Sequence, residues 1–162
     1  EKIGRMVSLW SRFEFNFDAA LLIILSLKES RNFARLSHPV PVSFKEKEKY
    51  WKFAFKNLDC LKMYRSQAIN LLEDAREANK DRNLVIHSLQ KGFTSDSPLT
   101  LELYKKEAKK SKQGEHSKEQ WLCTYEVTEH QIDAMIADCD RINTRLLPLI
   151  CFLISLTREK NI

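Results

Sequence analysis

The residues best suited to chemistry lie in one short stretch that begins at Arg82 and reads Arg-Asn-Leu-Val-Ile-His-Ser. An arginine binds the non-bridging oxygens of a phosphodiester through paired hydrogen bonds. A histidine moves a proton near neutral pH. On a helix, Asn83 and His87 lie one turn apart on the same face. The residue types therefore suit the binding and cleavage of a phosphodiester.

The spacing of this motif leaves two interpretations open. Arg82 stands five residues before His87, about 140° away around a helix at roughly 100° per residue. Its side chain must therefore reach around the helix or pair with a histidine of another chain. Asn79, Arg82 and Asn83 interrupt the apolar stripe of this helix. In the second interpretation, Arg82, Asn83 and His87 form a buried polar network that fixes the helix register. Glu14 or Asp18 would then supply the counter-charge.

Other candidate sites are less specific. No Cys-x-x-Cys pair and no glycine-rich phosphate loop occurs, and His38, His116 and His130 are scattered. We therefore expect neither a metal site nor a cofactor. A run of basic residues could follow a nucleic-acid backbone, and its alternative role is a solvated hairpin tip. Its members are Lys105, Lys106, Lys109 and Lys110.

Four amphipathic helices must position these residues. Apolar side chains recur every three or four positions over residues 1–28, 64–90 and the stretch after Thr128, and a shorter helix spans residues 43–58. Ser43 with Glu46 and Thr128 with Gln131 have the spacing of capping boxes. Gly92 is expected to end the third helix in a left-handed conformation.

Between the third helix and the last one, apolar residues recur at every second position instead of every third or fourth. Leu99, Leu101 and Leu103 alternate with polar residues, and residues 121–127 alternate in the same way. A period of two indicates strands with one buried face. The fold predicted for residues 1–162 is therefore a single, mainly α domain. It is a four-helix bundle with a β-hairpin, at about residues 99–127, inserted before the last helix.

The composition supports this class. The chain has 162 residues, a net charge of +5, three glycines and four prolines. So few helix breakers favour long helices, and the mild positive charge permits an anionic partner. The longest apolar runs are shorter than the ~18–20 residues that cross a bilayer, so no membrane association is expected. Isolated cysteines fit a reducing, cytoplasmic location.

The stretch that begins at Arg82, near the end of a long helix in a four-helix bundle, resembles the signature of the HEPN superfamily. That signature is an arginine, a polar residue and then a histidine four to six positions after the arginine. The segment Trp-Ser-Arg-Phe-Glu that begins at Trp10 is similar to one common in bacterial HEPN-like proteins. The hairpin before the last helix is similar as well. The resemblance thus covers most of the chain, although the motif is short.

The resemblance implies a homodimer in which two Arg-His sites face each other across a cleft, through the motif helix and the first helix. In active members that cleft cuts RNA without a metal, and other members are non-catalytic binding modules for a partner protein or nucleotide. By this resemblance, Arg82, Asn83 and His87 would be catalytic. The chain would be an endoribonuclease, a toxin or defence component opposed by an antitoxin-like protein.

Overall fold

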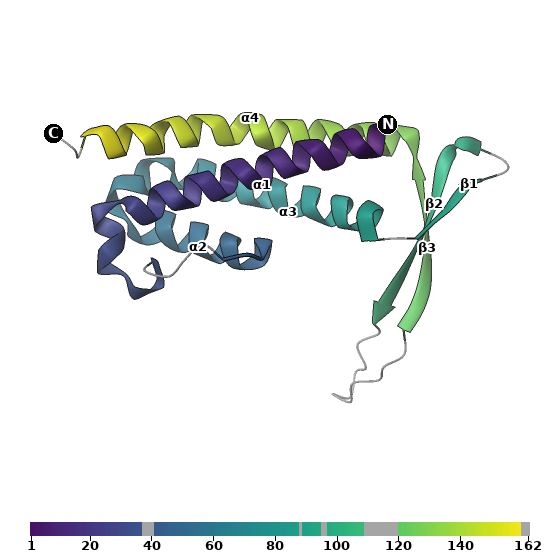
Figure 1. The fold of residues 1–162 in the computed structure, drawn as a ribbon, viewed down its shortest axis with the longest axis horizontal. Helices are drawn as coiled ribbons and strands as arrows, with labels where there is room; N and C mark the ends of the chain where they lie inside the picture. Colours follow the sequence, from purple (N-terminus) through teal and green to yellow (C-terminus); the bar gives the residue numbers. More distant parts are fainter. Residues whose placement is uncertain (37–40, 88, 95–96, 109–119, 160–162) are drawn as a thin grey trace.

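The computed structural model describes residues 1–36, 41–87, 89–94, 97–108 and 120–159, with side chains for residues 1–34, 36, 41–86 and 126–158. Four α-helices make up most of it (Figure 1): α1 Lys2–Ser26, α2 Phe44–Asn57, α3 Arg65–His87 and α4 Glu129–Glu159. Short 3-10 helices follow α1 and α2: η1 Lys28–Asn32, η2 Ala34–Leu36 and η3 Asp59–Tyr64. The predicted four helices are confirmed.

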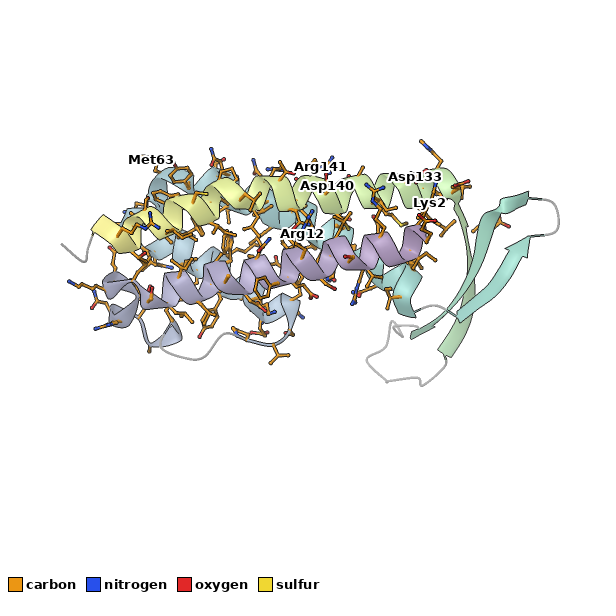
Figure 2. All side chains as sticks on the ribbon, turned by 45° about the horizontal axis from the view of Figure 1, so that its top comes forward. Lys2, Arg12, Met63, Asp133, Asp140 and Arg141 are labelled. Atoms are coloured by element: carbon orange, nitrogen blue, oxygen red, sulfur yellow. The ribbon has the colours of Figure 1, made fainter. Side chains whose placement is uncertain are left out.

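The helices lie side by side along one long axis (Figure 1). Lys2 of α1 pairs with Glu129 and Asp133 at the start of α4, and Arg12 pairs with Asp140 farther along, so α1 and α4 run in the same direction (Figure 2). The helix α3 runs in the opposite direction and brings its last turn, at His87, to the end where α4 begins.

Aromatic rings fill the core between α1 and α2. Trp10, Phe13 and Phe17 follow each other at helical spacing on α1 and are fully buried. The ring of Phe17 lies 4.9 Å from that of Trp51 on α2, whose own ring lies 4.7 Å from Phe55. The apolar stripe predicted for the first helix therefore faces the core, because burying these large rings supplies much of the driving force for packing.

Ion pairs between helices join consecutive elements of the bundle. Lys47 of α2 binds Asp18 of α1, Arg76 of α3 binds Glu48 of α2, and Arg145 of α4 binds Asp74 of α3. The side chains of Lys47 and Glu48 are largely buried, at 9% and 11% exposed. A buried charge must be paired, so these contacts restrict how the helices can shift against one another.

The capping box predicted at Thr128 is present, and at Ser43 the structure shows the bond made by the serine side chain. The amide of Glu46 donates to the Ser43 hydroxyl at 3.3 Å at the start of α2. At the start of α4, the Gln131 amide donates to Thr128 Oγ1 at 3.2 Å and the Thr128 amide donates to Gln131 Oε1 at 2.7 Å. These side chains satisfy backbone donors that have no partner within the first helical turn.

An antiparallel three-stranded sheet in the order β1-β2-β3 connects α3 to α4. Its strands are β1 Leu89–Thr94, β2 Ser97–Ala108 and β3 Gln120–Thr128. The sequence predicted strands only at about residues 99–127, whereas β1 begins directly after α3. The predicted helix end was therefore wrong: α3 stops at His87, and Gly92 lies within β1. From Leu89 on, the chain pairs with β2, which offers partners for its backbone groups.

The part of the chain that the structure describes contains no helix with both the length and the apolar character that crossing a membrane requires.

Candidate functional site

The polar patch predicted on the third helix is a short chain of hydrogen bonds on α3. Asn79 and Asn83 are four residues apart, so their side chains lie on the same face of the helix. Asn83 Nδ2 donates to Asn79 Oδ1 at 3.4 Å, and Arg82 Nη1 donates to Asn83 Oδ1 at 2.8 Å. All three side chains are half-buried. The two asparagines thus hold one edge of the guanidinium in place.

The charge of Arg82 has no acidic partner among the described side chains. Its Nε is buried and donates no hydrogen bond to any of them. A buried donor without a partner costs roughly 1–3 kcal/mol. Such a conflict between local chemistry and burial is typical of a site that receives a ligand, and an anionic oxygen would satisfy both the charge and the donor.

His87 is the last residue of α3. It lies four residues after Asn83, so the Cα atoms of Asn83 and His87 are on the same face of α3, one turn apart. The side chain of His87 lies outside the described residues. The structure therefore places the histidine at the end of the helix that carries Arg82, next to the sheet (Figure 1).

The two acidic residues expected to support the motif differ in their surroundings. Asp18 is bound by Lys47, whose Nζ donates to Oδ2 at 2.8 Å. Oδ1 lies 2.6 Å from the same nitrogen and is held by charge rather than by an aligned hydrogen bond. Asp18 is thus the counter-charge of Lys47, not of Arg82. Glu14 is half-buried and makes no hydrogen bond or ion pair with any described side chain.

Sequence analysis missed an acidic pair across the seam between α3 and α4. Burial raises the pKa of Asp81, and the negative charges of Asp138 and Glu77 raise it further. Burial and then Asp138 and Asp81 raise the pKa of the Cys139 thiol to about 11. This thiol stays protonated at neutral pH and is unsuited to act as a nucleophile. Asp81 precedes the motif directly, but nothing in the sequence shows that Asp138 faces it.

Replacing Asp81 with asparagine is expected to raise Tm at neutral pH. The folded-state pKa of Asp81 lies above its ordinary value of 3.8, so the folded protein loses stability as pH rises through the interval between the two. A neutral side chain avoids that loss at pH 7, and the gain should fade below about pH 4. For a domain of this size, a gain of about 1 kcal/mol in the free energy of unfolding raises Tm by roughly 2–4 °C. We take this shift as the upper bound of the increase in Tm.

Thermal unfolding at pH 7 and pH 3 measures this difference. Glu73→Gln is the control, because Glu73 is an exposed carboxylate of the same helix that does not contribute to the raised pKa of Asp81. A Tm at pH 7 that Asp81→Asn leaves unchanged or lowers would contradict the expectation.

The lysines expected to contact nucleic acid belong partly to the sheet. Lys105 and Lys106 are in β2, opposite Cys123 and Leu122 of β3. Lys109 and Lys110 lie outside the described residues. The sheet follows directly on the end of α3, so β2 belongs to the same end of the molecule as the motif (Figure 1).

Within the described residues, no group of three or more histidine, cysteine, aspartate or glutamate side chains has the arrangement of a metal site. Comparison of the chain with protein-family models, with curated proteins and with solved structures finds no match.

Proposed function

We propose that this protein is a metal-independent endoribonuclease of the HEPN type, acting as a homodimer. The observation that carries the proposal is the state of Arg82. Its guanidinium is fixed by Asn83, is half-buried, has an unpartnered Nε and lacks an acidic partner among the described side chains. A phosphodiester supplies the negative oxygens that this group lacks. The resemblance of the motif to the HEPN signature supports the same assignment.

The proposed reaction is attack of an RNA 2′-hydroxyl on the adjacent phosphorus. The O2′–P bond forms and the P–O5′ bond breaks, which leaves a 2′,3′-cyclic phosphate on one product and a 5′-hydroxyl on the other. One proton leaves O2′ and one reaches O5′, so the step needs a base and an acid. His87 fills one of these roles. Arg82 stabilises the charge that develops on the non-bridging oxygens.

The remaining predicted residues have supporting parts in this proposal. Asn83 orients Arg82, and Asn79 orients Asn83. Glu14 is proposed to position His87, because it makes no hydrogen bond or ion pair with Arg82. Lys105, Lys106, Lys109 and Lys110 are proposed to follow the RNA backbone on either side of the cut. An antitoxin-like partner would act by covering this end of the molecule.

Cleavage of labelled single-stranded RNA in excess chelator tests the proposal. Neither proposed role, proton transfer or charge stabilisation, requires a divalent ion, so we expect cleavage to persist with the chelator. The products should carry 2′,3′-cyclic phosphate ends. RNA of the same sequence with 2′-O-methyl groups should stay intact, because it lacks the attacking hydroxyl. Cleavage of this methylated RNA would refute the mechanism.

A non-catalytic binding module is the second candidate. The same observation supports it, because an uncompensated guanidinium binds the phosphates of a nucleotide without any proton transfer. This candidate predicts nucleotide binding that depends on Arg82 and not on His87.

A further inference from the structure

Exposed cations gather at the end of the helical bundle that lies opposite the sheet. They come from η1, the last turn of α2, the first residue of α3 and the last turn of α4, whose ends meet there (Figure 1). We call this set the basic pole. Its members are Lys28, Arg31, Lys56, Arg65 and Arg158.

Contacts between these elements confirm that they meet. The Glu29 carboxylate of η1 accepts hydrogen bonds from the amides of Asp59 and Cys60 at the start of η3. The ring of Tyr64, which precedes α3, lies 4.0 Å from that of Phe152 in the last third of α4. The elements that carry the five cations therefore meet at one end of the bundle.

The positive charge of this surface is not neutralised by neighbours. None of the five cations makes an ion pair with a described carboxylate, whereas Arg12, Lys52, Arg76 and Arg141, along the sides of the bundle, are paired. The two described carboxylates of η1 and η3 at this end are already engaged. Glu29 binds backbone amides, and Asp59 binds Lys62 at 2.5 Å.

Helix dipoles explain only part of the pole. Lys56 and Arg158 stand in the last turns of α2 and α4, where a cation interacts favourably with the helix dipole. Arg65 is the first residue of α3, where the same dipole disfavours a cation. Its exposed, unpaired guanidinium therefore contributes nothing evident to folding. An anionic partner gives it a role.

The polarity of the pole favours a polyanion over a lipid surface. Between residues 28 and 32 and between residues 56 and 65, Met63 is the one large apolar side chain recorded as exposed, at 84% (Figure 2). Binding in a bilayer interface requires several apolar side chains on one face. A phosphate backbone requires only accessible cations.

We propose that the basic pole holds the phosphate backbone of the single-stranded RNA that the protein cleaves, an inference that rests on the proposed function. Arg65 and Arg82 are 17 positions apart on one helix, which is about 26 Å at 1.5 Å per residue. The RNA is thus held at two places, at the pole and at the Arg82–His87 end. Contacts to phosphates position a nucleic acid without reading its sequence.

Binding of labelled single-stranded RNA over a salt series tests the pole separately from cleavage. The parent protein carries His87→Ala, which should slow cleavage by about 10²–10⁴-fold and so leave most of the RNA uncut during the binding measurement. Two doubly substituted variants are made in it: R31Q/R65Q at the pole, and K45Q/K49Q on the exposed side of α2 as a control that removes the same charge. For single strands, each phosphate contact contributes roughly 0.7 to the slope of log K against log salt, so the pole variant should lose about 1.4. The control should keep the parent slope.

Equal slopes for the parent and the pole variant would overturn the inference. Pole-dependent binding to vesicles that contain anionic lipid, without binding to RNA, would also overturn it and would assign the surface to a membrane. Thermal unfolding of the R31Q/R65Q variant should show no loss of stability, so weaker binding would not reflect unfolding. If the wild-type protein cleaves RNA but the R31Q/R65Q substitutions do not change RNA binding, this inference alone is refuted. Pole-dependent binding without any cleavage refutes the proposed function alone.

Discussion

The His87→Ala variant should cleave RNA about 10²–10⁴-fold more slowly than the wild-type protein, because it lacks the group proposed to transfer a proton. Arg82→Ala should lower the rate about as severely, by removing positive charge from the site where the transition-state phosphate would lie. Initial rates on one labelled single-stranded RNA measure both effects. Lys80→Ala is the matched control, because Lys80 is an exposed cation on the same helix that is paired with Glu77.

The variants must remain folded for these rates to have meaning. Arg82 is half-buried and bonded to Asn83, so its removal could disturb α3. Arg82→Lys separates the two effects, since it keeps a positive charge but cannot make paired hydrogen bonds. We expect it to be intermediate in rate and as stable as the wild-type protein. Unfolding of both alanine variants would instead identify Arg82, Asn83 and His87 as a structural network.

Dependence on pH adds a second test of His87. The rate of the wild-type protein should change across the range in which a histidine titrates, near pH 6.5. The His87→Ala variant should lose that change while retaining a low residual rate. An inert wild-type protein, together with nucleotide binding that only Arg82→Ala abolishes, would refute the nuclease and support the binding module.

Trp51→Ala should reduce the free energy of unfolding by about 3–5 kcal/mol, the usual cost of removing a large aromatic side chain from a core. Trp51 is fully buried between Phe17 and Phe55, with ring centroids 4.9 and 4.7 Å away. Its Nε1 donates to the carbonyl oxygen of Ala68 at 3.0 Å, which ties α2 to α3. A loss of this size is a large fraction of the stability of an ordinary domain.

Denaturant unfolding measures the effect, and Trp51→Phe is the control. Phenylalanine keeps an aromatic ring in the cavity but loses the indole donor, so its cost should be much smaller. Phe15→Ala should be nearly neutral, because that ring is 75% exposed. A Trp51→Ala protein that unfolds at the wild-type denaturant concentration would show that α2 does not share the cooperative core.

The sequence by itself determined the helical elements and their starts. Trp10, Phe13 and Phe17 recur at helical spacing and face the core, because a helix buries whichever side carries its large apolar residues. Ser43 and Thr128 mark helix starts because their side chains satisfy nearby backbone amides. The sequence also identified the polar break at Asn79, Arg82 and Asn83, since these residues interrupt an apolar stripe.

Only the tertiary structure decided how distant residues combine. The end of α3 at His87 depends on the pairing of β1 with β2, so a glycine five positions farther on was a misleading signal. Asp18 is bound by Lys47, and the negative charge of Asp138 acts on Asp81, because α2 packs against α1 and α4 packs against α3. No local sequence pattern indicates either interaction. Helical periodicity depends on neighbours three or four residues away. The partners of a charge depend on which helices lie side by side, and that is fixed by the packing of the whole core.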